Sequence, residues 1–228
     1  APDAEYVVVS MGSLSDVAKQ TVEYLQSQGE KVGAINVHLY RPFSNKYLLN
    51  DLPKTVKKIA VIDRTKDPGS LGEPLYLDVV DALAEAGRGD IKCYGGRYGL
   101  GSKEFTPTMV KAIYDNLALA EPKNHFTVGI IYDVMNTSIP MNEFVNAAPA
   151  GTICCKFFGL GSDGTVGANK NTIKIIGTPE LYSQAYFDYD SKKSGGYTCS
   201  HLRFGKSPIK APYLVNTPDF VACHVPSY

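Results

Sequence analysis

The sequence predicts an α/β protein with an open, mostly parallel sheet that has helices on both faces, followed by a second α/β domain. Continuous apolar segments, such as YVVVSM at residues 6–11, alternate with segments whose apolar residues recur at helical spacing. Strands that are apolar along their whole length are typical of parallel sheets buried on both faces. Right-handed crossovers then place the intervening helices against the sheet. We expect this architecture over residues 1–120.

The elements of this first domain follow one another with recognisable helix ends. Its strands are predicted at residues 6–11, 31–39, 57–62 and 91–94. Ser15 can cap a first helix, which Gly29 closes. Ser70 and Glu73 stand at capping-box spacing before a second helix. Pro107 favours the first position of a third helix.

Residues 121–145 interrupt the alternation of strands and helices. This segment contains two prolines and short apolar runs but no capped helix, so we interpret it as a connection between domains that can pair briefly as a strand. A second α/β domain is expected over residues 146–228. Its strands are predicted at residues 152–158, 185–188, 197–204 and 220–224, and its helix around residues 164–176. Both chain ends resemble the interior of a longer polypeptide, so we expect a fragment whose second domain is incomplete.

The composition is that of an ordinary globular protein and argues against several functional classes. Apolar residues make up 44% and charged residues 20% of the 228 residues. Lys+Arg and Asp+Glu both number 23, so the chain lacks the basic excess typical of nucleic-acid binding. No apolar run approaches the roughly 20 residues that a membrane helix needs. The five cysteines show neither CxxC nor zinc-finger spacing, so we expect no metal site and a reducing compartment.

The most informative stretch is FFGLGSDGTVGANKN, which runs from Phe157 to Asn171. It follows a predicted strand and precedes a predicted helix, so its backbone N–H groups and the positive end of the helix dipole can bind phosphate or pyrophosphate. Hydroxyl groups and one lysine add further donors. The candidate ligand-binding residues are Gly159, Gly161, Ser162, Asp163, Gly164, Thr165 and Lys170. We predict no catalytic residue in this chain.

Two alternative interpretations of this turn stay open. The sequence GLGSDG matches the G-x-G-x-x-G fingerprint, and Asp188 stands 24 residues beyond Gly164, where a dinucleotide fold places its ribose-binding acid. An NAD-binding dehydrogenase of Rossmann type is therefore one alternative. The other is a purely interdomain scaffold, in which this turn and the Gly-rich loop at residues 95–107 only dock neighbouring domains.

Several long motifs together resemble the pyruvate:ferredoxin (flavodoxin) oxidoreductase family and, equally, the matching region of pyruvate:NADP⁺ oxidoreductases. In chain order they are LYRPF, DRTKDPGSLGEPLYLDV, GGRYGLGSKEFTP, FFGLGSDGTVGANKNTIKIIG, GGYTCSHLRFG and PDFVACH. The resemblance covers nearly the whole chain. It implies that residues 1–120 are similar to the C-terminal domain of transketolase. It also implies that residues 146–228 begin a γ-type domain of 2-oxoacid oxidoreductases.

The resemblance further implies a full-length, homodimeric enzyme that decarboxylates pyruvate oxidatively to acetyl-CoA and CO₂, with coenzyme A (CoA) as co-substrate. Thiamine diphosphate, Mg²⁺ and 4Fe–4S iron–sulfur clusters belong to that enzyme but are not expected in this fragment, which should be inactive alone. Electrons would pass to ferredoxin, flavodoxin or a fused reductase, in the cytoplasm or in a mitochondrion-derived organelle. No nucleic acid or membrane is expected as a partner. Because the γ-type domain is implicated in CoA capture, the resemblance assigns the seven turn residues to CoA contact or to the face that covers the thiamine site.

Overall fold

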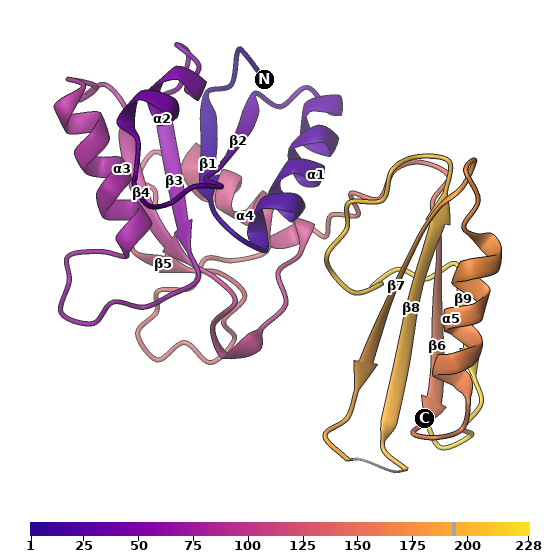
Figure 1. The fold of residues 1–228 in the computed structure, drawn as a ribbon. Coiled ribbons are helices and arrows are strands. Elements are labelled where there is room, and N and C mark those ends of the chain that lie inside the picture. The colour runs from indigo at the N-terminus through magenta and orange to yellow at the C-terminus, as the bar shows by residue number, and fades with distance from the viewer. Residues whose placement is uncertain (193–194) are drawn as a thin grey trace. The chain divides into compact units, whose positions relative to one another are not determined.

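The computed structural model describes residues 1–192 and 195–228, which form two compact units (Figure 1). Unit 1 comprises Ala1–Ala147 and unit 2 comprises Ala148–Tyr228. The segment 121–145, expected to connect the two domains, lies within unit 1, where Phe126 and Val128 are buried. Each unit contains helices and a sheet, so the predicted fold class of two α/β domains is confirmed.

Unit 1 is built on a five-stranded sheet with the order β2-β1-β3-β4-β5. The strands are β1 (Tyr6–Ser10), β2 (Val32–Asn36), β3 (Lys58–Asp63), β4 (Lys92–Arg97) and β5 (Phe126–Thr127). All four pairings between neighbours are parallel, as the continuous apolar segments predicted. The short β5 is the brief pairing expected in the segment 121–145.

Helices cover both faces of this sheet (Figure 1). They are α1 (Leu14–Ser27), α2 (Asn45–Asp51), α3 (Pro74–Glu85) and α4 (Pro107–Ala118), with a short 3₁₀ helix η1 at Leu100–Ser102. Val7 and Ile59 pack with residues of α2 and α3 in one core. Val8 and Ala60 alternate with them along the strands, point to the opposite face and are also fully buried. Burial on both faces explains why these strands are apolar throughout.

The helix ends of unit 1 agree only partly with the sequence signals. Gly29 takes a left-handed conformation just after α1, with φ +89°, and Pro107 opens α4, as predicted. However, α1 has Ser13 rather than Ser15 at its N-cap. The predicted capping box of Ser70 and Glu73 is wrong, because α3 begins at Pro74 and Glu73 itself is at the N-cap. The first amides of α3 donate instead to Asp63 on β3. Helix α2, which is only seven residues long, was not predicted.

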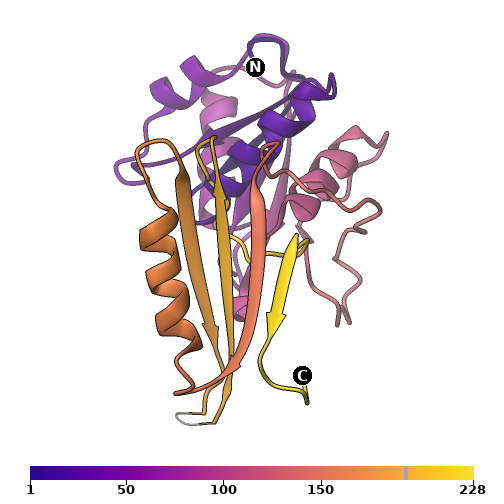
Figure 2. The same cartoon turned by 90° about the vertical axis from the view of Figure 1, so that its right-hand side faces the viewer.

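Unit 2 contains a mixed four-stranded sheet with the order β7-β8-β6-β9. The strands are β6 (Ile153–Leu160), β7 (Tyr182–Tyr189), β8 (Tyr197–Gly205) and β9 (Phe220–Cys223), and the helix is α5 (Thr165–Ile176). Strand β8 is antiparallel to both β6 and β7, whereas β9 is parallel to β6. Figure 2 shows the four strands side by side, with α5 lying along one face.

Within the described ranges, none of the helices has the length and apolar character that spanning a membrane requires.

Candidate functional site

The Gly-rich segment forms a tight turn between β6 and α5, at the place the sequence predicted. Ser162 and Gly164 both take left-handed conformations, with φ +74° and +88°. Gly159 is buried, and a Cβ there would lie 2.6 Å from Asp163 Oδ2 and 2.7 Å from Thr165 Oγ1. Glycine is therefore required at 159 because the turn folds back closely over the end of β6.

The carboxylate of Asp163 occupies the start of α5. Its Oδ1 accepts a hydrogen bond from the Thr165 amide and its Oδ2 accepts one from the Leu160 amide, each at 2.8 Å. Burial alone would raise the pKa of Asp163, but the hydrogen bonds from these two amides outweigh it and lower the pKa. The Asp163 carboxylate thus occupies the position at the start of α5 where the sequence predicted that amides would bind a phosphate. The amides of Val166 and Gly167 still have no acceptor within α5, since the first turn of a helix leaves them unpaired.

A hollow of about 580 Å³ adjoins this turn. Two polar side chains in it are already bonded along α5: the Asn169 amide donates to Thr165 O at 2.9 Å and the Thr172 hydroxyl donates to Ala168 O at 3.0 Å. Its size and mixed lining are typical of a site for a small, flexible molecule. The lining residues are Phe157, Leu160, Asp163, Gly164, Thr165, Ala168, Asn169, Thr172, His224 and Val225.

The structure brings six of the seven predicted site residues together at the turn and separates the seventh. Lys170 lies further along α5, where its Nζ is 5.4 Å from the centre of the Phe187 ring on β7. His224, which was not predicted from the sequence, also lines the hollow, and its charge helps to lower the pKa of Asp163. His224 reaches the hollow because β9 pairs with β6, with Cys223 opposite Phe158. No local sequence signal marks such a pairing.

The NAD-binding alternative is not supported by the sheet. Asp188 on β7 is in register with Cys199 on β8, which is in register with Phe158 on β6. Residues paired across neighbouring strands point to the same face of the sheet, so Asp188 shares a face with Phe158. Gly159, the next residue of β6, points to the other face, toward the turn and α5. Asp188 therefore points to the opposite face. The antiparallel β8 also separates β6 from β7, whereas a dinucleotide fold requires adjacent parallel strands.

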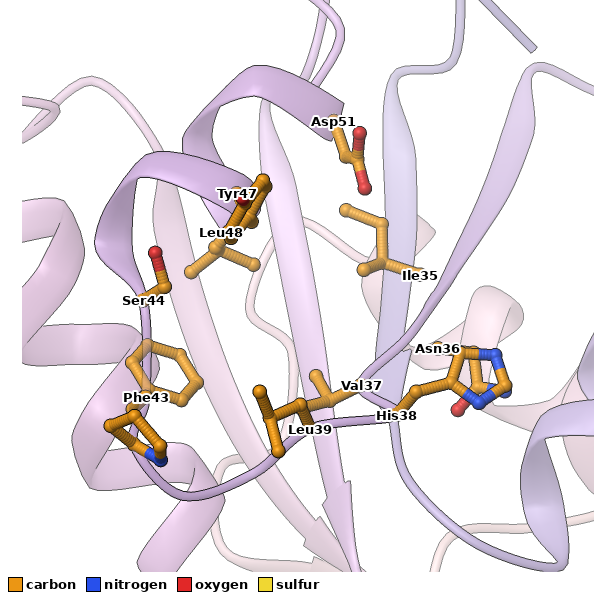
Figure 3. Close-up of a pocket in the computed structure, with 11 residues that line it drawn as sticks. Ile35, Asn36, Val37, His38, Leu39, Phe43, Ser44, Tyr47, Leu48 and Asp51 are labelled. Carbon is orange, nitrogen blue, oxygen red and sulfur yellow. The ribbon is translucent and has the colours of Figure 1, made fainter.

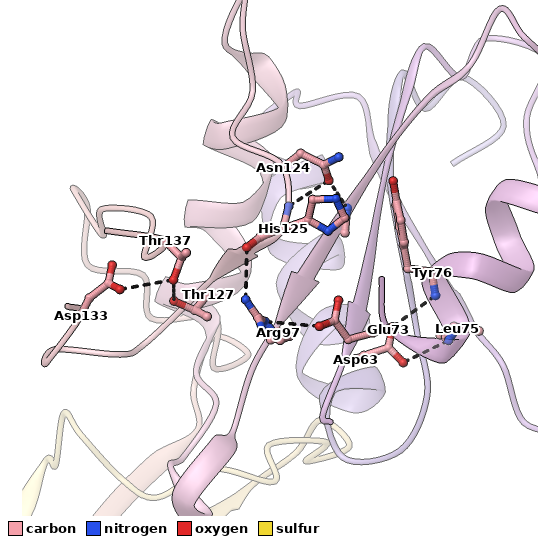
Figure 4. Close-up of polar contacts among 11 residues, drawn as sticks. Asp63, Glu73, Leu75, Tyr76, Arg97, Asn124, His125, Thr127, Asp133 and Thr137 are labelled. Carbon is pink, nitrogen blue, oxygen red and sulfur yellow. Dashed lines mark hydrogen bonds and ion pairs between the residues drawn. The ribbon is translucent and has the colours of Figure 1, made fainter. Parts of the chain in front are cut away.

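A second polar site lies in unit 1, at the junction of β3 and α3 (Figure 4). Asp63 is fully buried, and its carboxylate accepts the backbone amides of Leu75 and Tyr76, each at 3.2 Å. Burial raises the pKa of Asp63 to about 6, although the two amide bonds act in the opposite direction. Asp63 thus caps α3 from a neighbouring strand.

Beside it, Glu73 and Arg97 form an ion pair with 3.5 Å between Oε1 and Nε (Figure 4). Arg97 also donates to the carbonyl of His125 at 3.4 Å, and the rings of His125 and Tyr76 pack in a T-shaped arrangement with 5.4 Å between their centres. These contacts join α3, β4 and the segment before β5. Among the described residues, Glu73 Oε2 and Arg97 Nε are buried without a hydrogen-bond partner, so the ion pair compensates their charges but does not satisfy all of their polar atoms. We interpret this cluster as structural because its contacts all lie within unit 1.

An apolar groove of about 510 Å³ lies between the end of β2 and α2 (Figure 3). Its polar edge is a chain of hydrogen bonds, in which Ser15 Oγ donates to Asn36 Oδ1 at 2.7 Å and Asn36 Nδ2 lies 3.1 Å from His38 Nε2. The groove can receive a small apolar group. It is lined by Ile35, Asn36, Val37, His38, Leu39, Pro42, Phe43, Ser44, Tyr47, Leu48 and Asp51.

The described residues do not fit a metal centre or an iron–sulfur cluster. No group of three His, Cys, Asp or Glu side chains among them is placed to hold a metal ion. All five cysteines are free, and Cys154 and Cys155 are consecutive on β6, so their side chains point to opposite faces of the sheet.

Comparison with known proteins matches both units to one family. The model of pyruvate:ferredoxin oxidoreductase core domain II matches residues 4–110, and the model of pyruvate ferredoxin/flavodoxin oxidoreductase matches residues 154–228. Among curated relatives, the pyruvate:ferredoxin oxidoreductase of Moorella thermoacetica is 63% identical over 100% of this chain, which covers 20% of that protein. The pyruvate-flavodoxin oxidoreductase of Enterobacter agglomerans is 54% identical, again over 100% of this chain and 20% of the relative. The mitochondrial NADP⁺-dependent pyruvate dehydrogenase of Euglena gracilis is 54% identical over 100% of this chain and 13% of its own length.

Proposed function

Because the chain belongs to the pyruvate:ferredoxin/flavodoxin oxidoreductase family, we propose that it supplies two domains of an enzyme that converts pyruvate and CoA to acetyl-CoA and CO₂. The two family models match in chain order, and the chain spans about a fifth of the length of its bacterial relatives. We propose that residues 1–120 form the transketolase C-terminal-like domain, that residues 121–145 form its connection, and that residues 146–228 begin the γ-type domain.

In this proposal the redox chemistry belongs to other parts of a longer, homodimeric polypeptide. Thiamine diphosphate with Mg²⁺ would stabilise the carbanion that decarboxylation leaves, and 4Fe–4S clusters would carry the electrons away. Among the described residues, no group of three His, Cys, Asp or Glu side chains is placed to hold a metal ion. The chain alone is therefore expected to be inactive towards pyruvate.

We propose that the hollow beside the β6–α5 turn binds CoA. The observation that carries this proposal is a hollow of about 580 Å³ at the start of α5, inside the segment that matches the family model. Ionised Asp163 repels anions, so we place the uncharged pantetheine arm in the hollow and the phosphates outside it. Phe157, Leu160 and Val225 line the hollow and offer an apolar surface to the arm. Lys170 would reach only a part of CoA that runs along the outside of α5. We propose that seven residues contact CoA or form the face that covers the thiamine site. They are Gly159, Gly161, Ser162, Asp163, Gly164, Thr165 and Lys170.

Calorimetric titration of CoA into the longer protein tests this site with a matched pair of variants. Gly164 and Gly151 both have positive φ, +88° and +78°, and both have open space where a Cβ would lie. Each Gly→Ala change therefore introduces similar backbone strain in unit 2, but only Gly164→Ala distorts the turn. We expect Gly164→Ala to weaken CoA binding by about tenfold and Gly151→Ala to leave it within about twofold. Equal CoA affinity of the two variants would contradict the assignment of the hollow as the CoA site.

One observation favours the interdomain scaffold as a second candidate: the amides of Leu160 and Thr165 are already bonded to Asp163. If the turn only docks a neighbouring domain, Gly164→Ala or Lys170→Ala will change assembly of the longer protein and leave CoA affinity unchanged. Sedimentation velocity, run beside the calorimetry, separates the two candidates.

The electron acceptor is proposed from the names of the relatives, which include ferredoxin, flavodoxin and NADP⁺. The proposed location is the cytoplasm or a mitochondrion-derived organelle. Pyruvate-dependent reduction of each purified acceptor by the longer protein identifies the one that is used.

A further inference from the structure

One loop of unit 1 exposes four apolar side chains almost completely. Between β5 and the end of unit 1, Ile131 is 81% exposed, Tyr132 93%, Val134 97% and Met135 81%. Single exposed apolar residues are ordinary on protein surfaces, but a contiguous group marks an interaction site. We call residues 130–138 the apolar loop.

The apolar loop is held in one conformation by its own hydrogen bonds. The carboxylate of Asp133 turns back into the loop, where it accepts a hydrogen bond from the Ser138 amide. It also accepts one from the Thr137 hydroxyl at 3.2 Å (Figure 4). These bonds lower the pKa of Asp133, led by the bond from the Ser138 amide. Asn136 takes a left-handed conformation with φ +52°, which helps the chain to reverse. The single acidic residue of the loop is thus used internally, and the apolar side chains are left outside.

Lys123 attaches the apolar loop to the rest of unit 1, and a further bond closes the base of the loop. Lys123 Nζ donates to the carbonyl of Asn136 at 3.0 Å and to that of Ser138 at 3.2 Å. The Ser138 hydroxyl donates to the carbonyl of Ile130 at 3.0 Å, closing the base of the loop. A loop ordered before it binds loses little conformational entropy on binding, so its apolar area converts efficiently into affinity. The pre-formed shape is what a docking element requires.

We propose that the apolar loop docks into an apolar pocket on another domain of the same longer polypeptide, outside residues 1–228. This inference rests on the proposed function only in assuming that longer polypeptide. About four fifths of the length of the bacterial relatives lies outside the region that this chain matches, so ample structure exists to cover the loop. The pocket should hold Ile131 and Val134 and offer a hydrogen-bond partner to the Tyr132 hydroxyl, because buried tyrosines satisfy that group.

The charges argue against a membrane as the partner. Residues 126–142 contain no Lys or Arg, and the nearby Lys123 is bonded inward, so the loop has no basic group to attract anionic lipid. A second copy of this chain is also disfavoured. A projecting loop that enters a groove elsewhere on a copy makes a head-to-tail contact, which propagates into filaments unless it closes a ring.

Oxidation of Met135 by hydrogen peroxide measures whether the loop is covered. Peptide mass spectrometry follows the rate in this chain alone and in the longer protein, with added free methionine as the reference. Because oxidation follows exposure of the sulfur, we expect Met135 to react at nearly the free rate in the chain alone and about tenfold more slowly in the longer protein. Equal rates in the two proteins, or slow oxidation already in the chain alone, would overturn the proposal.

The double variant Tyr132→Ser, Val134→Ser in the longer protein should restore fast oxidation of Met135, since docking loses its main apolar contacts. The control is Leu71→Ser, which removes an 89% exposed apolar side chain from the loop between β3 and α3 and should leave Met135 protected. Protection of the isolated chain by phosphatidylserine vesicles, or self-association of that chain that Tyr132→Ser abolishes, would also overturn the proposal. Pyruvate oxidation is assayed in parallel, so its absence counts against the proposed function while Met135 protection alone decides the loop.

Discussion

Two strand-to-helix junctions use the same chemistry in opposite surroundings. At β3–α3, Asp63 accepts the amides of Leu75 and Tyr76, and at β6–α5, Asp163 accepts those of Leu160 and Thr165. Asp63 is fully buried, and burial raises its pKa to about 6. Asp163 is exposed, and its amide bonds outweigh the effect of burial and lower its pKa. The degree of burial therefore decides whether a capping aspartate belongs to the core or remains an accessible negative charge at the surface.

The largest expected effect comes from removing the buried cap. Asp63→Ala should lower the free energy of unfolding of unit 1 by roughly 2–4 kcal/mol, because two amides lose their acceptor at about 1–3 kcal/mol for each buried donor. Native-state hydrogen exchange of the β1 and β3 amides reports on unit 1 alone. Asp67→Ala, in the exposed loop that follows, is the control and should change little. A loss below about 1 kcal/mol for Asp63→Ala would contradict the assigned role.

Next in size is the close approach of the turn to β6. Gly159→Ala should lower the free energy of unfolding of unit 2 by about 1–3 kcal/mol, because the new Cβ would overlap Asp163 and Thr165. The matched control is Gly167→Ala in α5, where nothing lies within 4 Å of the added Cβ. That control should be neutral or stabilising by up to about 1 kcal/mol, since alanine is the better helix former. Hydrogen exchange of the β6 and β8 amides measures both, and equal effects would refute the packing argument.

The exposed cap should matter less than the buried one. Asp163→Ala is expected to lower the free energy of unfolding of unit 2 by about 1 kcal/mol, the usual value of an N-cap. Asp163→Asn keeps one acceptor and should lose only a few tenths of a kcal/mol, because asparagine is also a good cap. The same exchange experiment gives both values. A loss as large as that of Asp63→Ala would erase the proposed difference between the junctions.

The most specific effect is on the pH dependence of stability. The folded-state pKa of Asp63 is about 6, above its ordinary 3.8, so folded unit 1 binds more protons in this window than the unfolded chain. Asp63 therefore makes unit 1 lose stability as the pH rises from about 4 to about 6. The lowered pKa of Asp163 has the opposite sign, and its contribution is lost only as the pH falls below the ordinary value. Subtracting the free energy of unfolding of Asp63→Asn from that of the wild type at each pH isolates the contribution of Asp63. A difference that does not change between about pH 4 and about pH 6 would contradict this contribution.

The fold of unit 1 was largely visible in the sequence because both faces of its strands are buried. Val7, Val8 and Val9 are all nearly inaccessible, so the strand carries an uninterrupted apolar signal. Helix α2 was missed because seven residues are too few for a clear period. The cap of α3 was misassigned because Ser70 and Glu73 have the right local spacing, whereas Asp63 approaches only once the chain has folded.

The candidate site was predictable only where it is local. The turn, including Gly159 and Gly164, follows from glycine spacing between a strand and a helix. The role of His224 depends on the β6–β9 pairing, which joins segments more than 60 residues apart and has no short-range signature. The position of Lys170 away from the turn follows from helical geometry, which a strand–turn–helix motif alone does not define.

Hydrogen exchange of the longer protein with and without CoA tests the central claim most directly. If the hollow beside the β6–α5 turn binds CoA, the amides of Gly164, Ala168 and Asn169, which line it, should exchange at least about tenfold more slowly with the ligand present. The amides of Leu75 and Tyr76, at the matched junction in unit 1, should exchange at the same rate in both samples. Unchanged exchange at the turn under saturating CoA would contradict the assignment.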